Sequence, residues 1–167
     1  MSSTDPDSTA TGVSEAVFRH TPGERSRRGI GFFDTNVLIY LLDEKDLRKY
    51  EVARDLIAQA LKTGNGIISF QVVQETLNVM TKKLPVPASP AQAENFFTKT
   101  LAPLWKVNPS PELYRRGLGI HSRYQYSFYD SLIIAAAQEA GCRNLYSEDL
   151  QHGQRIGALA IQNPFAL

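Results

Sequence analysis

The chain alternates short apolar runs with longer segments in which apolar residues recur at helical spacing. The apolar runs at residues 30–33 and 67–70 have the length of buried strands. Further strands are expected at residues 104–107, 144–147 and 158–162. Strands that alternate with amphipathic helices predict a parallel sheet with helices on both faces, in a single α/β domain.

The intervening segments carry the helical pattern, together with residues that favour the beginning and end of helices. Helices are expected over residues 37–42, 48–62, 71–83, 91–100, 111–124 and 129–140. Ser89 and Pro90 suit the start of the fourth helix, and Gly64 and Gly66 suit the end of the second. The last helix is alanine-rich and apolar on nearly every side, so it is expected to be buried, with Gly141 as its end.

Residues 1–29 differ in composition from the rest of the chain, being rich in Ser, Thr, Asp, Gly and Arg with few aromatic residues. Such a composition buries too little apolar area to offset the entropy lost on ordering. We therefore expect a flexible N-terminal leader over residues 1–29 and one folded domain over residues 30–167. The basic residues Arg25, Arg27 and Arg28 are interpreted as solvated charge in preference to phosphate contacts.

Composition argues against several classes of protein. The 18 basic and 17 acidic side chains give a net charge of +1, so a surface for nucleic acid has to be a local patch. Cys142 is the only cysteine, which leaves no partner for a disulfide within the chain and no cysteine pair for structural zinc. The sequence shows neither a signal-peptide pattern nor an apolar run of membrane-spanning length. These features predict a cytoplasmic protein with no membrane contact.

Four acidic residues fall at junctions between the expected elements. Asp34 follows the first strand, and Glu75 lies one turn into the helix after the second strand. Asp130 begins the alanine-rich helix, and Asp149 follows the strand at residues 144–147. Because ligands bind at the carboxyl ends of parallel strands, side chains from these junctions can share one crevice. Carboxylates gathered without matching bases repel one another unless a cation joins them, and Mg²⁺ or Mn²⁺ is the economical cation.

Each acid taken alone has an ordinary structural explanation. Asp130 suits a helix cap or a partner of the helix dipole, Glu75 a solvated helix residue, and Asp149 a turn residue. A shared site is favoured over these separate roles because all four acids are expected at the same edge of the sheet.

The acids lie within motifs that carry a family resemblance. These motifs are Phe33-Asp34-Thr35-Asn36-Val37, Gln74-Glu75, Tyr129-Asp130-Ser131-Leu132-Ile133, Tyr146-Ser147-Glu148-Asp149-Leu150 and Asn163-Pro164-Phe165. In this order and spacing, over about residues 32–165, the chain resembles the PIN domain, and specifically the VapC-type toxin ribonucleases. The leader before the first strand departs from that family, whose chains usually begin almost at the strand.

The resemblance implies a three-layer α/β/α domain with a parallel central sheet. It also implies a Mg²⁺- or Mn²⁺-dependent endoribonuclease that hydrolyses RNA phosphodiesters with a metal-activated water. The implied partners are the RNA substrate, an antitoxin protein encoded beside the toxin, and a second copy of the chain in a homodimer.

The resemblance also assigns the site residues by position. The family's acidic quartet matches Asp34, Glu75, Asp130 and Asp149, and its common polar neighbours match Asn36 and Ser147. Asp34 and Asp130 are expected to be the central metal ligands, with the other two acids completing the site. Glu148 is an alternative to Asp149 as the fourth acid.

Two other functions stay open. A phosphohydrolase or phospho-acceptor domain would use Asp34 as a covalent nucleophile. Such a domain needs a second acid two residues after the first, where this chain has Asn36. Such a domain also needs a lysine before the late acids, and none is evident. The other alternative is a non-catalytic RNA-binding module of the same fold. Because no arginine or lysine closely neighbours the acidic motifs, metal is expected to be the largest positive charge available to the phosphate.

The histidines and one aromatic cluster are weaker candidates. His20, His121 and His152 share no metal-binding spacing and are interpreted as non-ligands, with His152 alone near enough to touch a substrate. The cluster Tyr124, Tyr126, Phe128 and Tyr129 could stack on bases, but packing in the core or against a partner is the preferred interpretation.

Overall fold

The elements follow one another largely as the apolar pattern predicts, in a computed structural model that describes residues 29–166. The strands are β1 (Gly31–Phe33), β2 (Gly66–Ser69), β3 (Trp105–Val107), β4 (Asn144–Tyr146), β5 (Arg155–Ile156) and β6 (Leu159–Gln162). The helices are α1 (Thr35–Ile39), α2 (Leu47–Thr63), α3 (Phe70–Asn78), α4 (Pro90–Phe96), α5 (Ala102–Leu104), α6 (Pro111–Tyr124) and α7 (Phe128–Glu139), with the π-helical turns η2 (Val79–Lys83) and η3 (Phe97–Leu101). The predicted leader, except for Gly29, and His20 lie outside the described residues.

The sheet has the strand order β3-β2-β1-β4-β6-β5. Every neighbouring pair is parallel except β5 and β6, which form an antiparallel pair at one edge. The predicted parallel sheet is therefore confirmed. The two-residue strand β5 was not predicted, because two residues give no readable periodicity.

The strand order reverses direction between β1 and β4. From β1 the chain continues outward to β2 and β3, whereas from β4 it continues to β6 on the opposite side. The loops after β1 and β4 therefore diverge and leave a crevice at the carboxyl ends of these two strands, where open α/β sheets bind their ligands.

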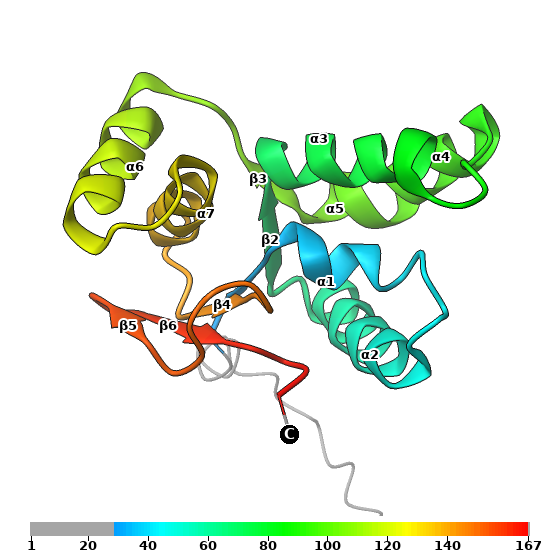
Figure 1. Cartoon of the computed structure of the whole chain (residues 1–167), viewed down its shortest axis with the longest axis horizontal. Helices are drawn as coiled ribbons and strands as arrows, with labels where there is room; N and C mark the ends of the chain where they lie inside the picture. Colours follow the sequence, from blue (N-terminus) through cyan, green and yellow to red (C-terminus); the bar gives the residue numbers. More distant parts are fainter. Residues whose placement is uncertain (1–28, 167) are drawn as a thin grey trace, which may run out of the picture.

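Helices cover both faces of the sheet (Figure 1). Helix α7 packs against β2 and β4 and is covered by α6, while α2 packs against β2. In the figure α6 and α7 lie together on one side of β1 and β2, and α1 and α2 lie on the other. The alanine-rich helix α7 buries seven consecutive residues from Ser131 to Ala137, as predicted. Within residues 29–166, no helix combines the length and the apolar character that crossing a membrane requires.

Side-chain caps explain where several helices begin. The first-turn backbone donates to the side chains of Asp34, Asp46, Ser89, Ser110 and Ser127. These hydrogen bonds satisfy amides that the helix itself leaves without a partner. The predicted start at Ser89 and Pro90 is confirmed, and Gln92 completes a capping box there.

The two glycines expected to end the second helix have different roles. Gly64 ends α2 in the left-handed conformation, with φ of 69°. Gly66 instead lies in β2, so its assignment as a helix end is wrong. A Cβ atom on Gly66 would lie 2.6 Å from the Cβ of Ala60 and 2.9 Å from Cδ2 of Leu104. The absence of a side chain at Gly66 allows α2 and α5 to approach β2 closely.

We expect Gly66→Ala to lower the free energy of unfolding by about 1–3 kcal/mol, because the added methyl group overpacks the core. Gly119 is the matched control, since it lies exposed in α6 with no atom within 4 Å of an added Cβ. Gly119→Ala should raise the free energy of unfolding by about 0.5–1 kcal/mol through helix propensity. Urea denaturation measures both, and equal stability of the two variants would contradict the packing at Gly66.

Candidate active site

A cleft of about 370 Å³ opens at the carboxyl ends of β1 and β4. All four predicted acids line it, although they come from four different parts of the chain. The lining residues are Asp34, Thr35, Asn36, Ile39, Gln71, Glu75, Asn78, Val79, Lys83, Tyr129, Asp130, Ile133 and Asp149. The parallel strands thus bring the distant acidic motifs to a common cleft.

Asp34 is the most deeply buried of the four acids, with 7 % of its surface exposed. It directly follows β1 and caps α1, where its Oδ1 accepts a hydrogen bond from the Thr35 backbone N at 2.7 Å. Its Oδ2 accepts hydrogen bonds from Oγ of Ser147 at 2.7 Å and from Nδ2 of Asn36 at 3.3 Å. Three donors from two strand ends therefore fix the position of one carboxylate.

Burial raises the pKa of the Asp34 carboxyl from its usual value of 3.8 to about 6. The hydrogen bonds from Ser147 and Thr35 lower this pKa, and the negative charges of Glu75 and Asp149 raise it. The carboxylate is thus placed where its charged form is disfavoured by loss of water and by neighbouring acids.

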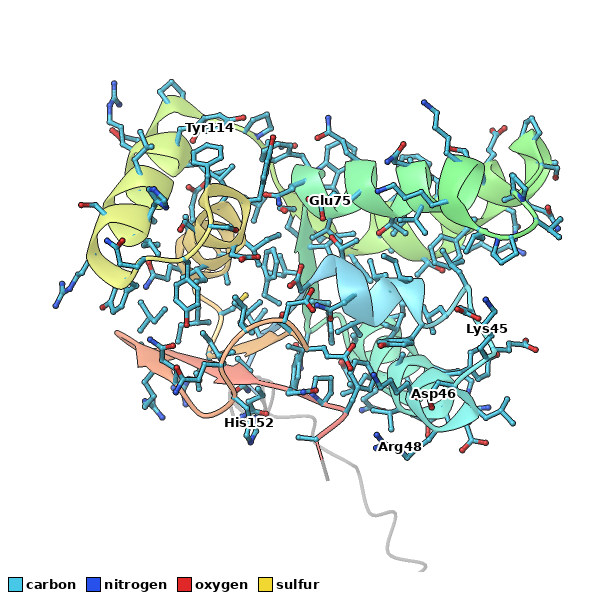
Figure 2. The ribbon with its side chains drawn as sticks, in the orientation of Figure 1. Lys45, Asp46, Arg48, Glu75, Tyr114 and His152 are labelled. Atoms are coloured by element: carbon cyan, nitrogen blue, oxygen red, sulfur yellow. The ribbon has the colours of Figure 1, made fainter. Side chains whose placement is uncertain are left out.

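Glu75 projects from α3 toward α1, as Figure 2 shows. Its Oε2 accepts a hydrogen bond from Oγ1 of Thr35 at 2.5 Å, and its Oε1 accepts one from Nε2 of Gln71 at 2.9 Å. Gln71 lies one turn before Glu75 on the same helix and also reaches the backbone carbonyl of Tyr129 at 3.4 Å. These contacts orient Glu75 toward the cleft and join α3 to α7.

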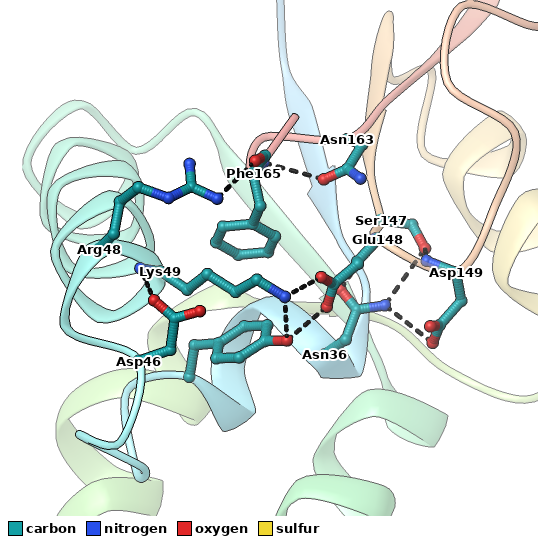
Figure 3. Close-up of polar contacts among 10 residues, drawn as sticks. Asn36, Asp46, Arg48, Lys49, Ser147, Glu148, Asp149, Asn163 and Phe165 are labelled. Carbon is teal, nitrogen blue, oxygen red and sulfur yellow. Dashed lines mark hydrogen bonds and ion pairs between the residues drawn. The ribbon is translucent and has the colours of Figure 1, made fainter. Parts of the chain in front are cut away.

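Asn36 bridges the carboxylates that follow β1 and β4. Figure 3 shows its contacts with the loop after β4. Its Nδ2 lies 3.3 Å from Oδ2 of Asp34, 3.3 Å from Oγ of Ser147 and 3.1 Å from Oδ2 of Asp149. Its Oδ1 accepts a hydrogen bond from the Glu148 backbone N at 3.2 Å. Because the amide both donates and accepts, Asn36 holds the loop after β4 in position beside α1.

Asp130 lies in the first turn of α7, where Ser127 is the N-cap. The hydroxyl of Ser127 donates to Oδ2 of Asp130 at 2.7 Å, and the backbone N of Asp130 lies 3.1 Å from the same hydroxyl oxygen. The predicted position at the helix start is confirmed. The residue lines the cleft while also taking part in the cap.

Glu148 and Asp149 point to different surroundings. Glu148 is ion-paired with Nζ of Lys49 and accepts a hydrogen bond from the Tyr40 hydroxyl at 2.5 Å. The Lys49 ammonium and the Tyr40 hydroxyl lower the pKa of Glu148 against the opposing effect of partial burial. Asp149 lines the cleft and Glu148 does not. The geometry therefore favours Asp149 as the fourth acid.

The C-terminal segment packs on this ion pair (Figure 3). Phe165, with 3 % of its surface exposed, meets the ring of Tyr40 edge-on at 4.8 Å between ring centroids. The Lys49 ammonium lies 4.8 Å from the ring centroid of Tyr40 and 5.7 Å from that of Phe165. Nη2 of Arg48 donates to the Phe165 carbonyl at 2.9 Å. The N-terminus of α2, the end of the chain and the loop after β4 are thereby tied together.

The donor set of the cleft fits a hard divalent cation. Among residues 29–166, none of the four acids is within ion-pair distance of a lysine or arginine. In the same part of the chain, no group of three or more Asp, Glu, His or Cys side chains is arranged to hold a metal ion by itself. Mg²⁺ usually binds to one or two carboxylates and keeps several waters as its other ligands. The carboxylates of the cleft therefore suit Mg²⁺ without surrounding it completely.

Several lining residues were not predicted as site residues. Thr35 and Gln71 orient Glu75. Gln71 precedes Glu75 by four residues on the predicted helix, so its spacing could have indicated the contact, whereas that of Thr35 could not. The expectation that no lysine neighbours the acids is wrong, because Lys83 lines the cleft. Lys83 lies eight residues beyond Glu75, whereas regular helical spacing places position 82 on the face of Glu75, so spacing alone did not indicate Lys83.

The other candidates occupy varied surroundings. Tyr129 lines the cleft with 65 % of its surface exposed, whereas Tyr124, Tyr126 and Phe128 pack partly buried against the core. Nδ1 of His152 accepts the Asn163 backbone N at 3.0 Å, and Nδ1 of His121 lies 2.6 Å from the Tyr126 carbonyl oxygen. Neither histidine lines the cleft.

The fold and the cleft define a parallel α/β domain with an acidic site at the switch point of its sheet. A family model described as the PIN domain matches residues 31–155, and the chain belongs to this family of nucleases. The predicted family and fold class are thereby confirmed.

Solved structures give the same fold. A chain of a toxin-antitoxin complex from Klebsiella pneumoniae is 20% identical with a TM-score of 0.59, covering 82% of this chain and 99% of its own length. VapC20 of Mycobacterium tuberculosis, a toxin that cleaves the sarcin-ricin loop, is 20% identical with a TM-score of 0.52, covering 71% of this chain and 89% of its own. None of the curated proteins compared with the chain matches it.

The raised pKa of Asp34 makes stability depend on pH. A carboxyl whose pKa is about 6 when folded and 3.8 in its usual state takes up protons on folding. It therefore favours the folded state at low pH, and this advantage is lost as the pH rises through about 6. Wild type should lose this stabilisation between pH 4 and pH 7, whereas Asp34→Asn, which has no carboxyl group at this position, should not. In the presence of chelator, the difference in free energy of unfolding (Asp34→Asn minus wild type) should therefore increase by about 2–3 kcal/mol over this range.

Urea denaturation at a series of pH values measures this difference. Asp55→Asn is the control, because Asp55 is exposed on α2 and 73 % of its side chain is accessible. A difference between Asp34→Asn and wild type that stays constant with pH would contradict the burial of a charged Asp34.

Proposed function

We propose that this protein is a divalent-metal-dependent endoribonuclease and the toxin of a toxin-antitoxin pair. The observation that carries the proposal is the convergence of Asp34, Glu75, Asp130 and Asp149 on one cleft with no cationic partner within ion-pair distance. Membership of the PIN domain family supports a nuclease. The antitoxin partner is proposed by likeness to the Klebsiella toxin-antitoxin complex.

Asp34 and Asp130 are proposed to hold Mg²⁺ or Mn²⁺, with Glu75 and Asp149 completing the site. When bound, the cation supplies positive charge that stabilises the transition state at phosphorus and makes a water easier to deprotonate. The fit rests on the oxygen donors of the cleft and on the raised pKa of Asp34, whose charged form a nearby cation would favour.

The chain's own residues position the acids and a water. Asn36 and Ser147 donate to Asp34 and hold its Oδ2 in one orientation, while Thr35 and Gln71 hold both oxygens of Glu75. The described residues that line the cleft include no cysteine, serine or histidine. We therefore assign the attack to water and to no side chain. Asp149, which accepts only from Asn36 among the described hydrogen bonds, is the acid best placed to orient that water.

RNA is the proposed substrate because the cleft is open to solvent and lies in a nuclease fold, and the related VapC20 is described as cleaving the sarcin-ricin loop. An accessible single-stranded backbone suits such a cleft better than a duplex. The homodimer and the cytoplasmic location stay predictions, as does the flexibility of the leader.

The phospho-acceptor function is less well supported. Lys83 now supplies a lysine near the acids, but Asn36 still stands where a second acid is wanted. Both oxygens of Asp34 already accept hydrogen bonds, which lowers their availability for attack on phosphorus. Incubation with acetyl phosphate and Mg²⁺ tests this alternative, since a covalent aspartyl phosphate would add the mass of one phosphoryl group to the intact protein.

We expect purified protein to cleave fluorescently labelled single-stranded RNA with Mg²⁺ or Mn²⁺ and to lose this activity in chelator. Asp34→Asn should lower the rate by more than about a hundredfold, because loss of even an outer partner of a metal site costs up to that factor. Asp55→Asn should cleave at the wild-type rate. Cleavage that survives chelator or Asp34→Asn, with the fold intact by circular dichroism, would count against the proposal.

The two neighbouring acids after β4 should differ in their effect on cleavage. We expect Asp149→Asn to lower the cleavage rate about tenfold more than Glu148→Gln does, because Asp149 lines the cleft and Glu148 does not. Glu148→Gln should chiefly change stability, since Lys49 loses its partner. A larger loss of cleavage in Glu148→Gln, with unchanged thermal stability, would assign the fourth acid to Glu148 instead.

A further inference from the structure

Lys83 introduces a positive charge into a cleft that is otherwise acidic. Among the described residues that line the cleft, it is the only lysine, arginine or histidine. Its side chain is exposed, and it is not within ion-pair distance of any acid in residues 29–166. An ammonium group at an acidic cleft, neither buried nor committed to a carboxylate, is available to an anionic ligand.

The π-helical turn η2 determines which lysine faces the cleft. Gln71, Glu75 and Asn78 line the cleft from α3, and in an uninterrupted α-helix the next position on that face is 82. The wider turn of η2 (Val79–Lys83) inserts an extra residue. As a result Lys83 lines the cleft, while Lys82 lines a separate groove with Glu94 and Phe97.

We propose that Lys83 binds a backbone phosphate of the RNA that occupies the cleft. This inference rests on the proposed ribonuclease function. RNA is a polyanion, and four carboxylates repel it even after a divalent cation has neutralised two of the charges. A lysine ammonium is a mobile point charge that binds phosphate without a fixed geometry. It lowers that repulsion and holds the backbone beside the acids.

Tyr129 adds an aromatic side chain to the lining of the same cleft. It extends from α7 beside Asp130, mostly exposed, and contacts Phe128 edge-on at 5.5 Å between ring centroids. The lining therefore offers a cation from η2 and an aromatic side chain from α7. A nucleotide chain in the cleft would therefore meet its phosphate partner on η2.

The experiment compares adjacent lysines on the same turn. Binding of fluorescein-labelled single-stranded RNA is measured by anisotropy in full-length Asp34→Asn protein, which is expected not to cut it, with Lys83→Ala, Lys83→Arg or Lys82→Ala added. Lys83→Ala should weaken binding about tenfold. Lys83→Arg should restore most of the affinity, and Lys82→Ala should bind as its parent does.

Salt dependence separates a phosphate contact from a structural effect. Each phosphate contact to a single strand contributes about 0.7 to the slope of log K against log[salt]. The slope for Lys83→Ala should therefore be about 0.7 smaller than that of its parent, with an unchanged thermal unfolding temperature. In the cleaving protein, Lys83→Ala should raise KM for RNA more than it lowers kcat.

Equal affinities and salt slopes for Lys83→Ala and Lys82→Ala would overturn the inference. Failure of the Asp34→Asn protein to bind RNA at all would overturn it as well. Cleavage by the wild-type protein reports on the proposed function separately, so a nuclease that cuts RNA with an unaffected Lys83→Ala variant loses only the role of Lys83.

Discussion

The buried carboxylate of Asp34 is the constraint on which the rest of the site depends. The parallel sheet places it at the switch point, where the paths from β1 and β4 diverge. Burial and the charges of Glu75 and Asp149 make its ionised form costly, while donors from Ser147, Thr35 and Asn36 hold it in place. A cation bound beside Asp34 would favour the ionised form of this carboxylate.

Two sets of contacts transmit this arrangement to the surrounding elements. Asn36 connects Asp34 to the loop after β4, and the ion pair of Glu148 with Lys49 connects that loop to α2. Phe165 covers the pair from the C-terminal end. Glu148 therefore contributes from outside the cleft, by fixing the loop that carries Asp149. Adjacent acids in the sequence thus have different contacts because successive side chains leave the loop in different directions.

Much of the fold could be predicted from the sequence because each strand is a short apolar run and most helices have readable ends. The edge strand β5 is too short to leave a pattern, and Gly66 is a turn signal in sequence although it serves close packing in β2. The acids could be placed at one edge from strand ends alone. The support that Thr35 gives to Glu75 could not be predicted, since this contact forms only where α1 and α3 meet. The contact of Gln71 with Glu75 follows from i, i+4 spacing on α3. Lys83 was missed because the π turn changes which residue faces the cleft.

The central claim is that the four acids form a divalent-cation site. Titration of the full-length protein with Mn²⁺, followed by electron paramagnetic resonance of the free ion, tests it without any RNA. We expect saturable binding to the wild-type protein and its loss in Asp34→Asn. Wild-type protein that leaves all Mn²⁺ free, or an Asp34→Asn protein that binds Mn²⁺ equally well, would contradict the account.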